Sequence, residues 1–130
     1  MYRLRLMSEY FEIAVRWAFA MQMVFWGLNG FFHWINIPPA SPVIDRFVTA
    51  CMETKFIMPS VKLIEIVFGL FLIMNFAVPL SLAAFAPLLF VITGLHLFHN
   101  PKPWTVLILN TLPYCLLLTL HSGPLLRLVH

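Results

Sequence analysis

Four long apolar stretches take up most of this chain, and the connections between them are polar or contain proline. The stretches cover about residues 12–37, 60–78, 80–98 and 104–120. Each is close to the roughly 20 apolar residues that an α-helix needs to cross about 30 Å of hydrocarbon. We therefore expect an all-α membrane protein: a single four-transmembrane-helix up-and-down bundle over residues 1–130, with no separate soluble domain.

The composition supports a membrane location, because 62% of the 130 residues are hydrophobic, only 10% are charged and the mean hydropathy is +0.92. The net charge of +3 is spread along the chain without a polybasic block, so the expected partner is the lipid bilayer and not nucleic acid. The two cysteines, Cys51 and Cys115, form no C-x-x-C pair, which argues against thiol–disulfide chemistry. Cys115 is expected to lie deep in apolar surroundings and to be unreactive.

A short amphipathic helix is predicted at about residues 42–54, between the first two apolar stretches. Ser41 is a candidate N-cap, and Pro42 suits the first helical position. The apolar residues of this segment recur on one face: Val43, Ile44, Phe47, Val48 and Cys51. We expect this helix to lie in the membrane interface, either as a lid over the mouth of the bundle or as a simple connector.

Local signals set expectations for helix ends and packing. The first helix is expected to begin near Ser8 and to stop before the Pro38–Pro39 pair, with Arg16 snorkelling to the interface. Pro113 should free the carbonyl of Leu109, which then needs a partner inside the bundle. Small residues that should permit close helix approach are Gly27, Gly30, Gly69, Ala83, Ala84 and Gly94.

Each apolar stretch carries one polar pair whose members are three or four residues apart. The pairs are Asn29/His33, Lys62/Glu65, His96/His99 and Asn110/Tyr114. If the helices alternate in direction, all four pairs lie at one end of the bundle. Polar side chains within a membrane are unfavourable, by about 2.5–3.5 kcal/mol per charge at its centre, so they usually point inward and often mark function. We expect these eight residues to form a ligand-binding or proton-exchanging layer.

The sequence leaves two interpretations of the Lys62/Glu65 pair open. The two residues share a helix face and can form a structural ion pair, with Lys62 also able to snorkel to the headgroups. In the functional interpretation, Glu65 exchanges protons or binds a ligand, assisted by Lys62 and a histidine.

The histidines have a structural and a functional interpretation, and the fourth pair is expected to be structural. His33, His96 and His99 could hold haem iron from facing helices, but histidines near helix ends are commonly hydrogen-bonded interfacial residues. Covalent haem is excluded without a C-x-x-C-H motif, and a metal site is not expected because the Glu-x-x-His signature is absent. Asn110 and Tyr114 should satisfy backbone groups freed by Pro113, or bond to another helix.

The segment from Lys62 to Leu72, followed by Asn75 and Val78-Pro79-Leu80, resembles the K-x-x-E-x-x-x-G-L-x-L signature of DoxX-like membrane proteins. Other short matches agree in order and spacing: Gly27-Leu28-Asn29-Gly30 with Phe32-His33, Ala86-Pro87 and Leu95-His96-Leu97-Phe98. The resemblance covers about residues 13–110 and implies a small four-helix membrane bundle. DoxX itself is associated with a membrane subunit of a quinone-linked sulfur-oxidising system. The resemblance therefore implies Lys62 and Glu65 as the motif pair, with His33 and His96 beside them.

These observations predict a protein that binds a quinone-like amphipathic molecule in the polar layer and acts as a redox-linked membrane subunit. If it is an enzyme, it is part of a quinone-linked oxidoreductase. The alternative is a non-catalytic partner or assembly subunit, which binds another membrane protein or a second copy of itself. Further alternatives are a haem-binding protein and a small-solute transporter. The expected location is a bacterial inner membrane, with both termini cytoplasmic.

Overall fold

The computed structural model describes residues 2–36 and 41–129, with side chains through residue 127, and nearly all of them are helical. No strand occurs among these residues, which confirms the all-α class. The helices are α1 (Tyr2–Phe32), α2 (Pro42–Glu53), α3 (Ile57–Ile73), α4 (Val78–His99), α5 (Trp104–Val106), the π-helix η1 (Leu107–Thr111), α6 (Leu112–Leu120) and α7 (Ser122–Val129).

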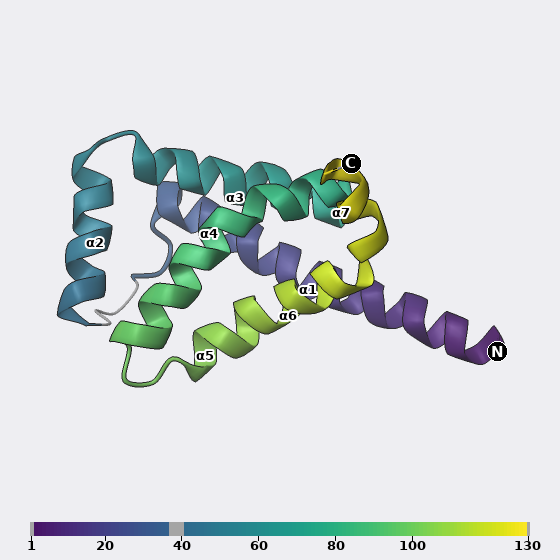
Figure 1. The fold of residues 1–130 in the computed structure, drawn as a ribbon. Coiled ribbons are helices and arrows are strands. Elements are labelled where there is room, and N and C mark those ends of the chain that lie inside the picture. Colours follow the sequence, from purple (N-terminus) through teal and green to yellow (C-terminus); the bar gives the residue numbers. More distant parts are fainter. Residues whose placement is uncertain (1, 37–40, 130) are drawn as a thin grey trace.

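Four rods run in alternating directions: α1, α3, α4 and the continuous α5–η1–α6 segment (Figure 1). α1 packs against α3 and α6, while α4 packs against α3 and η1, so the rods close into a ring. α2 lies across one end of the rods, and α7 turns back at the other end (Figure 1). The expected up-and-down arrangement is therefore present, with the four polar pairs on segments that meet at the α2 end.

All four rods contribute to one apolar core. Its buried residues are Phe19, Ala20 and Met23 of α1, Leu72 of α3, Val78, Leu82, Phe85 and Leu89 of α4, and Tyr114 and Leu117 of α6. The Phe19 ring lies at its centre, 5.3 Å from the Phe85 ring and 5.6 Å from the Tyr114 ring. Edge-to-face and tilted ring pairs of this kind stabilise a fold beyond the area that they bury.

α1 and α3 approach closely because glycines face the neighbouring helix. A Cβ atom on Gly27 would lie 2.6 Å from Ile66 Cγ1 and 2.9 Å from the Lys62 carbonyl oxygen. A Cβ atom on Gly69 would lie 2.7 Å from a Val24 methyl group. Glycine at these positions is therefore required by packing, as expected. The same expectation is wrong for Gly94, whose Cβ position has no atom within 4 Å.

The turn between α3 and α4 is a Schellman motif. Asn75 adopts the left-handed conformation, at φ 54°, and its N–H donates to the Leu72 carbonyl. The Phe76 N–H donates to the Phe71 carbonyl, and the rings of Phe71 and Phe76 pack at 5.1 Å. Asn is one of the few residues that tolerates this backbone region. This motif ends α3 at Ile73, five residues before the expected end.

α2 was correctly predicted, at Pro42–Glu53, and the Ser41 hydroxyl accepts a hydrogen bond from the Ile44 N–H at 3.3 Å. Only two residues of its expected apolar face, Ile44 and Cys51, are buried, whereas Phe47 and Val48 are exposed. The axes of α2 and α3 differ by 94°. α2 therefore rests on the bundle end through a narrow stripe and leaves apolar side chains facing outward.

α1 differs from its predicted bounds at both ends, since it begins at Tyr2 and ends at Phe32 instead of covering residues 12–37. Ser8 lies inside the helix, and Pro38–Pro39 lies outside the described residues. The Asn29 side chain explains the early end: Oδ1 accepts from the Ile35 N–H at 2.8 Å, and Nδ2 donates to the Ile35 carbonyl at 3.0 Å. These bonds close a turn in which His33 has a φ of 54°.

The fourth rod contains a π-helical turn immediately before Pro113, where the proline cannot donate to the preceding turn. The Gln22 side chain of α1 donates to the Leu109 carbonyl at 2.8 Å. The expectation that this carbonyl needs a partner is confirmed, and the partner belongs to another helix, but the bond lies at the exposed surface of the rods and not inside the bundle. α7 was not predicted from the sequence.

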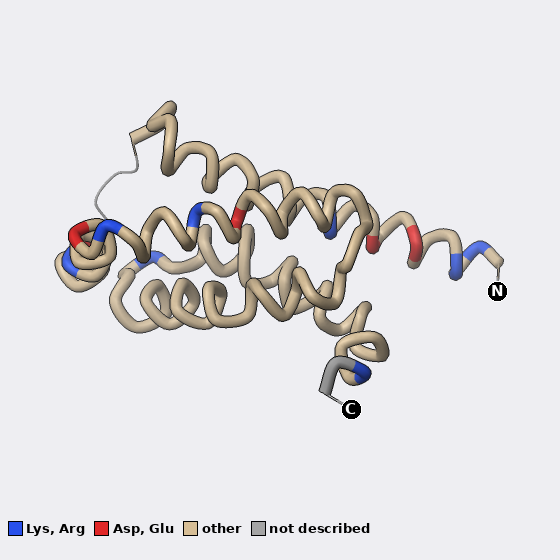
Figure 2. The backbone as a smooth tube through the Cα atoms, turned by 90° about the horizontal axis from the view of Figure 1, so that it is seen from above, with Lys and Arg blue, Asp and Glu red and all other residues tan. Residues whose placement is uncertain are grey.

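One described helix, α4, is long and apolar enough to cross a membrane, and α2 with α3 would add a second if that bent pair is counted as one span. Only 28% of the most apolar stretch of α4 is buried, unlike a core helix of a soluble protein. Residues 78–99 and 104–120 contain no Asp, Glu, Lys or Arg. Charged residues are concentrated instead on α2 and the first half of α1, with one pair on α3 (Figure 2).

Candidate functional site

Lys62 and Glu65 form an ion pair at the α1–α3 interface, with Nζ and Oε2 3.4 Å apart. The Glu65 side chain is only 6% exposed and that of Lys62 18%. The aliphatic stem of Lys62 lies over Gly30, and the Glu65 Cβ lies beside Gly27. The ion pair that the spacing allows is present, and it lies within α3. Its two side chains meet α1 through the Lys62 stem and the Glu65 Cβ, which pack on the glycines of α1.

Asn29 lies in the last turn of α1, and His33 directly follows the helix. Asn29 is 4% exposed, and its amide is engaged with the backbone of Ile35. His33 follows the helix and is exposed. These two residues form the turn that ends α1 and do not face a cavity described below.

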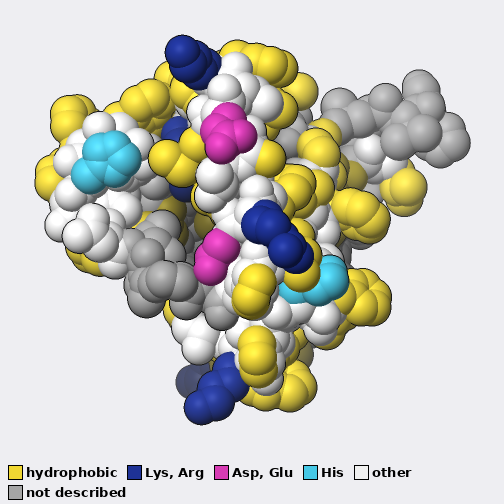
Figure 3. Space-filling model, turned by 90° about the vertical axis from the view of Figure 1, so that its left-hand side faces the viewer, with side chains coloured by type: hydrophobic (Ala, Val, Ile, Leu, Met, Phe, Trp, Pro, Cys, Tyr) yellow, Lys and Arg dark blue, Asp and Glu magenta, His cyan; other side chains and the backbone are white. Residues whose placement is uncertain are grey.

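His96 and His99 occupy the last turn of α4. The Asn100 Nδ2 donates to His96 Nδ1 at 2.9 Å, and His99 is exposed. Figure 3 looks onto this end of the molecule, where histidine, basic and acidic side chains lie among apolar ones. Within residues 2–36 and 41–129, no group of three or more His, Cys, Asp or Glu side chains could hold a metal ion.

Of the fourth pair, Asn110 and Tyr114, only Tyr114 makes one of the expected structural bonds. The buried Tyr114 hydroxyl donates to the Leu82 carbonyl of α4, which confirms the expected bond to another helix. Asn110 does not satisfy a freed carbonyl, since Gln22 does so instead. In the described part of the chain, the buried Asn110 Oδ1 has no hydrogen-bond partner.

The larger pocket lies between α4, η1–α6 and α7, with a volume of about 810 Å³. We call it the α4–α6–α7 pocket. Its walls include Ala86, Phe90, Thr93, Gly94, Leu97, Thr111, Tyr114, Cys115, Leu118, Ser122, Leu125 and Leu126. Of the eight residues expected to form a ligand-binding layer, only Tyr114 lines it. The open space beside Gly94 is part of this pocket.

Four of the lining residues carry hydroxyl groups, Thr93, Thr111, Tyr114 and Ser122, and the first two form a hydrogen-bonded pair. Thr93 Oγ1 of α4 and Thr111 Oγ1 of η1 lie 2.7 Å apart, and either can donate to the other. A hydroxyl has one donor and two acceptor sites, so the accepting hydroxyl keeps an O–H to offer elsewhere. The π-helical turn ends at Thr111, and such turns are frequent at functional sites. The pocket can therefore hold an apolar body and hydrogen-bond one acceptor oxygen.

Cys115 also differs from its expected environment. It is exposed and lies on the pocket wall, whereas Cys51 lies on the buried face of α2. The thiol of Cys115 is therefore accessible from the pocket. A cysteine in an apolar helix gave no signal of this position, because helical periodicity does not show which face meets a neighbouring helix.

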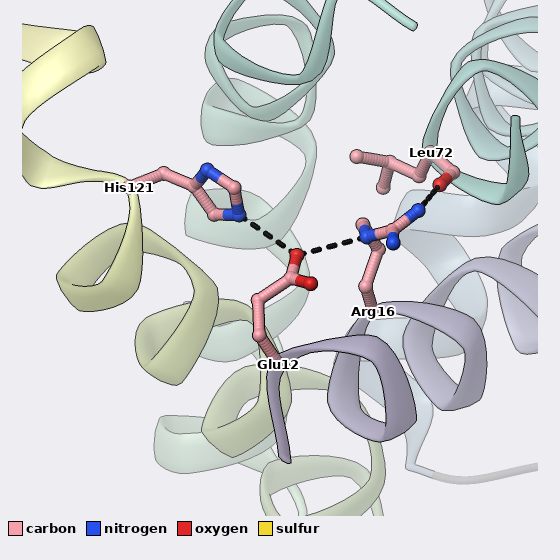
Figure 4. Close-up of polar contacts among 4 residues, drawn as sticks. All are labelled: Glu12, Arg16, Leu72 and His121. Carbon is pink, nitrogen blue, oxygen red and sulfur yellow. Dashed lines mark hydrogen bonds and ion pairs between the residues drawn. The ribbon is translucent and has the colours of Figure 1, made fainter. Parts of the chain in front are cut away.

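A second polar cluster lies at the opposite end of the bundle (Figure 4). Glu12 Oε1 accepts from Arg16 Nε at 2.8 Å and contacts His121 Nε2 at 2.9 Å, and Arg16 Nη1 donates to the Leu72 carbonyl at 2.5 Å. Arg16 is 5% exposed, so the expectation that it snorkels is wrong. The partial negative charge of the α3 C-terminus holds the guanidinium inside instead.

This cluster borders a smaller pocket of about 370 Å³, lined by Ser8, Glu9, Glu12, Ile13, Arg16, Asn75 and Leu120. The spacing of Glu12 and Arg16, four residues apart on one helix, was the available sequence signal. His121 is 109 residues from Glu12 and could not be assigned to the cluster without the fold.

No family model, curated protein or solved structure matches this chain. The resemblance to DoxX-like proteins therefore stays a prediction.

Proposed function

We propose that this chain is a small integral membrane protein, with four helices crossing the bilayer, that binds an amphipathic quinone-like molecule in the α4–α6–α7 pocket. As a DoxX-like protein it would act as a membrane subunit of a redox-linked system. The observation that carries the proposal is the pocket itself, which joins an apolar space to a pair of hydroxyl groups.

The outer surface of the rods supports a lipid environment. Large apolar side chains are exposed on each rod: Trp17 and Met21 of α1, Leu63 and Leu70 of α3, Leu80 and Phe90 of α4, and Ile108 and Leu112 of the fourth rod. A soluble monomer rarely exposes contiguous apolar patches larger than a few hundred Å². In a bilayer, the same side chains meet acyl chains without any unfavourable exposure.

The size and chemistry of the pocket support the ligand class. Its volume of about 810 Å³ falls within the range of small-molecule sites, which is about 300–1,000 Å³. The walls are almost entirely apolar, so they suit a ring or an isoprenoid tail. The Thr93–Thr111 pair can donate one hydrogen bond to a quinone carbonyl.

Lys62 and Glu65 take a different part in this proposal from the one first expected. Neither residue lines the α4–α6–α7 pocket. Their side chains pack on Gly27 and Gly30 of α1, and α3 in turn packs on α4. Proton exchange at Glu65 remains a separate hypothesis, and ligand binding that depends on the Glu65 carboxylate would favour it.

Cys115 provides a reporter for the test. In a Cys51→Ser protein reconstituted in lipid nanodiscs, Cys115 is the remaining thiol, and its rate of maleimide labelling is measured with and without a decyl benzoquinone. The quinone is fully ring-substituted, so that it has no open position for thiol addition. The control ligand is a saturated hydrocarbon of equal tail length without carbonyl groups.

We expect the quinone to slow labelling of Cys115 several-fold and the hydrocarbon to do so much less. A Thr93→Val, Thr111→Val protein should lose the difference between the two ligands while keeping its fold. Equal labelling with and without saturating quinone would rule out this pocket as the binding site.

A second candidate, a non-catalytic partner or assembly subunit, is favoured by one feature. The first part of α1 projects beyond the bundle (Figures 1 and 2), and it exposes Tyr2, Leu4 and Met7. A complex isolated in mild detergent that is lost in a Leu4→Glu, Met7→Glu protein would support this function. A monomeric protein that binds quinone normally would count against it.

A further inference from the structure

α7 forms one wall of the α4–α6–α7 pocket. Ser122, Leu125 and Leu126 face the space, and Leu125 also packs against the bundle core. Among the other side chains of α7 through residue 127, Gly123, Pro124 and Arg127 are exposed. Movement of α7 would therefore open or close the pocket without disturbing the four rods.

The joint between α6 and α7 is the single residue His121. Its backbone N–H still donates to the Leu117 carbonyl, as in a helix, but its φ and ψ of −110° and 23° break the helical path. Its carbonyl accepts the Leu125 N–H and so begins α7. The conformation of this one residue sets the direction in which α7 leaves the bundle.

The His121 side chain is tied to α1 by the Glu12 carboxylate. Because an ionised carboxylate can only accept, the His121 Nε2–H donates to Glu12 Oε1, at 2.9 Å. Glu12 itself is held by Arg16 Nε, and Arg16 is buried and bonded to the Leu72 carbonyl (Figure 4). Glu12 is thus a preorganised acceptor, held by Arg16 of its own helix and, through Arg16, by the C-terminal end of α3.

We propose that Glu12 and His121 are positioning residues that latch α7 against the pocket and thereby set the rate at which its ligand enters and leaves. The ligand part of this inference rests on the proposed function. The latch is a property of the free protein and can be tested without any ligand. Arg16 supports the latch by holding Glu12, and the core contact of Leu125 provides the apolar part of the closed state.

The test is amide hydrogen exchange of residues 122–127 in the full chain, in nanodiscs without ligand. His121→Leu removes the donor, and His121→Gln keeps one on a side chain of similar reach. Glu9→Gln is the matched control, because Glu9 lies one turn before Glu12 and has no bond to His121 among the described contacts.

We expect about tenfold faster exchange of α7 in His121→Leu, which corresponds to about 1.4 kcal/mol. His121→Gln and Glu9→Gln should exchange like the unmodified protein, and α4 should not change in any variant. Unchanged exchange of α7 in His121→Leu would overturn the latch, and so would equal acceleration in all helices, which indicates general destabilisation.

A second arm separates the latch from the ligand. If the α4–α6–α7 pocket binds the decyl benzoquinone, its dissociation should also be about tenfold faster in His121→Leu. Faster α7 exchange with no quinone binding to any variant would keep the latch and reject the proposed ligand. Quinone binding with the same dissociation rate in His121→Leu as in the unmodified protein would reject the role of the latch in ligand exchange.

Discussion

Replacing Gly27 by Ala tests the close packing of α1 on α3, on which the arrangement of the rods depends. The new Cβ would lie 2.6 Å from Ile66 Cγ1, 2.9 Å from the Lys62 carbonyl oxygen and 3.2 Å from the Glu65 Cβ. The Lys62 oxygen is backbone, so it cannot move aside without shifting α3. Overpacking of this kind typically destabilises by about 1–3 kcal/mol.

Gly94 provides the matched control, because its Cβ position has no atom within 4 Å. Both glycines are inside helices, so each substitution gains about 1 kcal/mol of helix propensity. This gain cancels in the difference between the two variants. We therefore expect Gly27→Ala to be less stable than Gly94→Ala by about 1–3 kcal/mol, the overpacking term alone.

The assay is the unfolding of both variants in the same detergent, followed by circular dichroism. Gly94→Ala should be at least as stable as the unmodified protein. Equal stabilities of the two variants would show that α1 and α3 do not pack at the distance described, and the geometry of the ion pair beside Gly27 would be wrong with it.

Three further predictions concern stability and use the same unfolding assay. Lys62→Met leaves Glu65 buried and unpaired and should destabilise the protein by about 3–5 kcal/mol. Glu65→Gln should destabilise it less, because the unpaired Lys62 is nearer the helix end and can reach the interface. A larger loss in Glu65→Gln than in Lys62→Met would contradict this. Arg16→Met should destabilise by about 1.5–3 kcal/mol through the lost charged hydrogen bonds, and Arg16→Lys should not restore it, since one ammonium lacks the geometry for both acceptors. Asn75→Gly should be nearly neutral, while Asn75→Val should lose about 1–2 kcal/mol, because a β-branched residue disfavours a φ of 54°; equal stability of these two variants would argue against the Schellman turn.

The sequence was sufficient for features that depend on local chemistry or overall polarity. The four rods, α2 with its Ser41 cap, and the Lys62–Glu65 pair all follow from apolar runs, capping residues and helical spacing. Pro113 has no N–H to donate to the Leu109 carbonyl, so the sequence also indicates that this carbonyl needs another partner. In each case the interacting groups are close in sequence, or the requirement comes from one backbone group.

The candidate site could not be predicted because it depends on which faces of the rods meet. α4 and α6 are apolar on every side, so their periodicity does not distinguish a pocket wall from a lipid-facing surface. No sequence pattern singles out Thr93 and Thr111, and only the fold brings their Oγ1 atoms to within 2.7 Å of each other. The prediction that Arg16 snorkels is wrong because the sequence does not reveal that Arg16 lies beside the C-terminal end of α3, where it donates to the Leu72 carbonyl.

The most direct test of the proposed function is to find where a quinone binds. A photoreactive azido-benzoquinone is irradiated with the protein in nanodiscs, and the modified peptides are identified by mass spectrometry. We expect adducts on α4 near Gly94, on α6 near Cys115 and on α7, with competition by the decyl benzoquinone. Competable adducts confined to the α1–α3 interface around Lys62 and Glu65, or no competable adducts at all, would contradict binding in the α4–α6–α7 pocket.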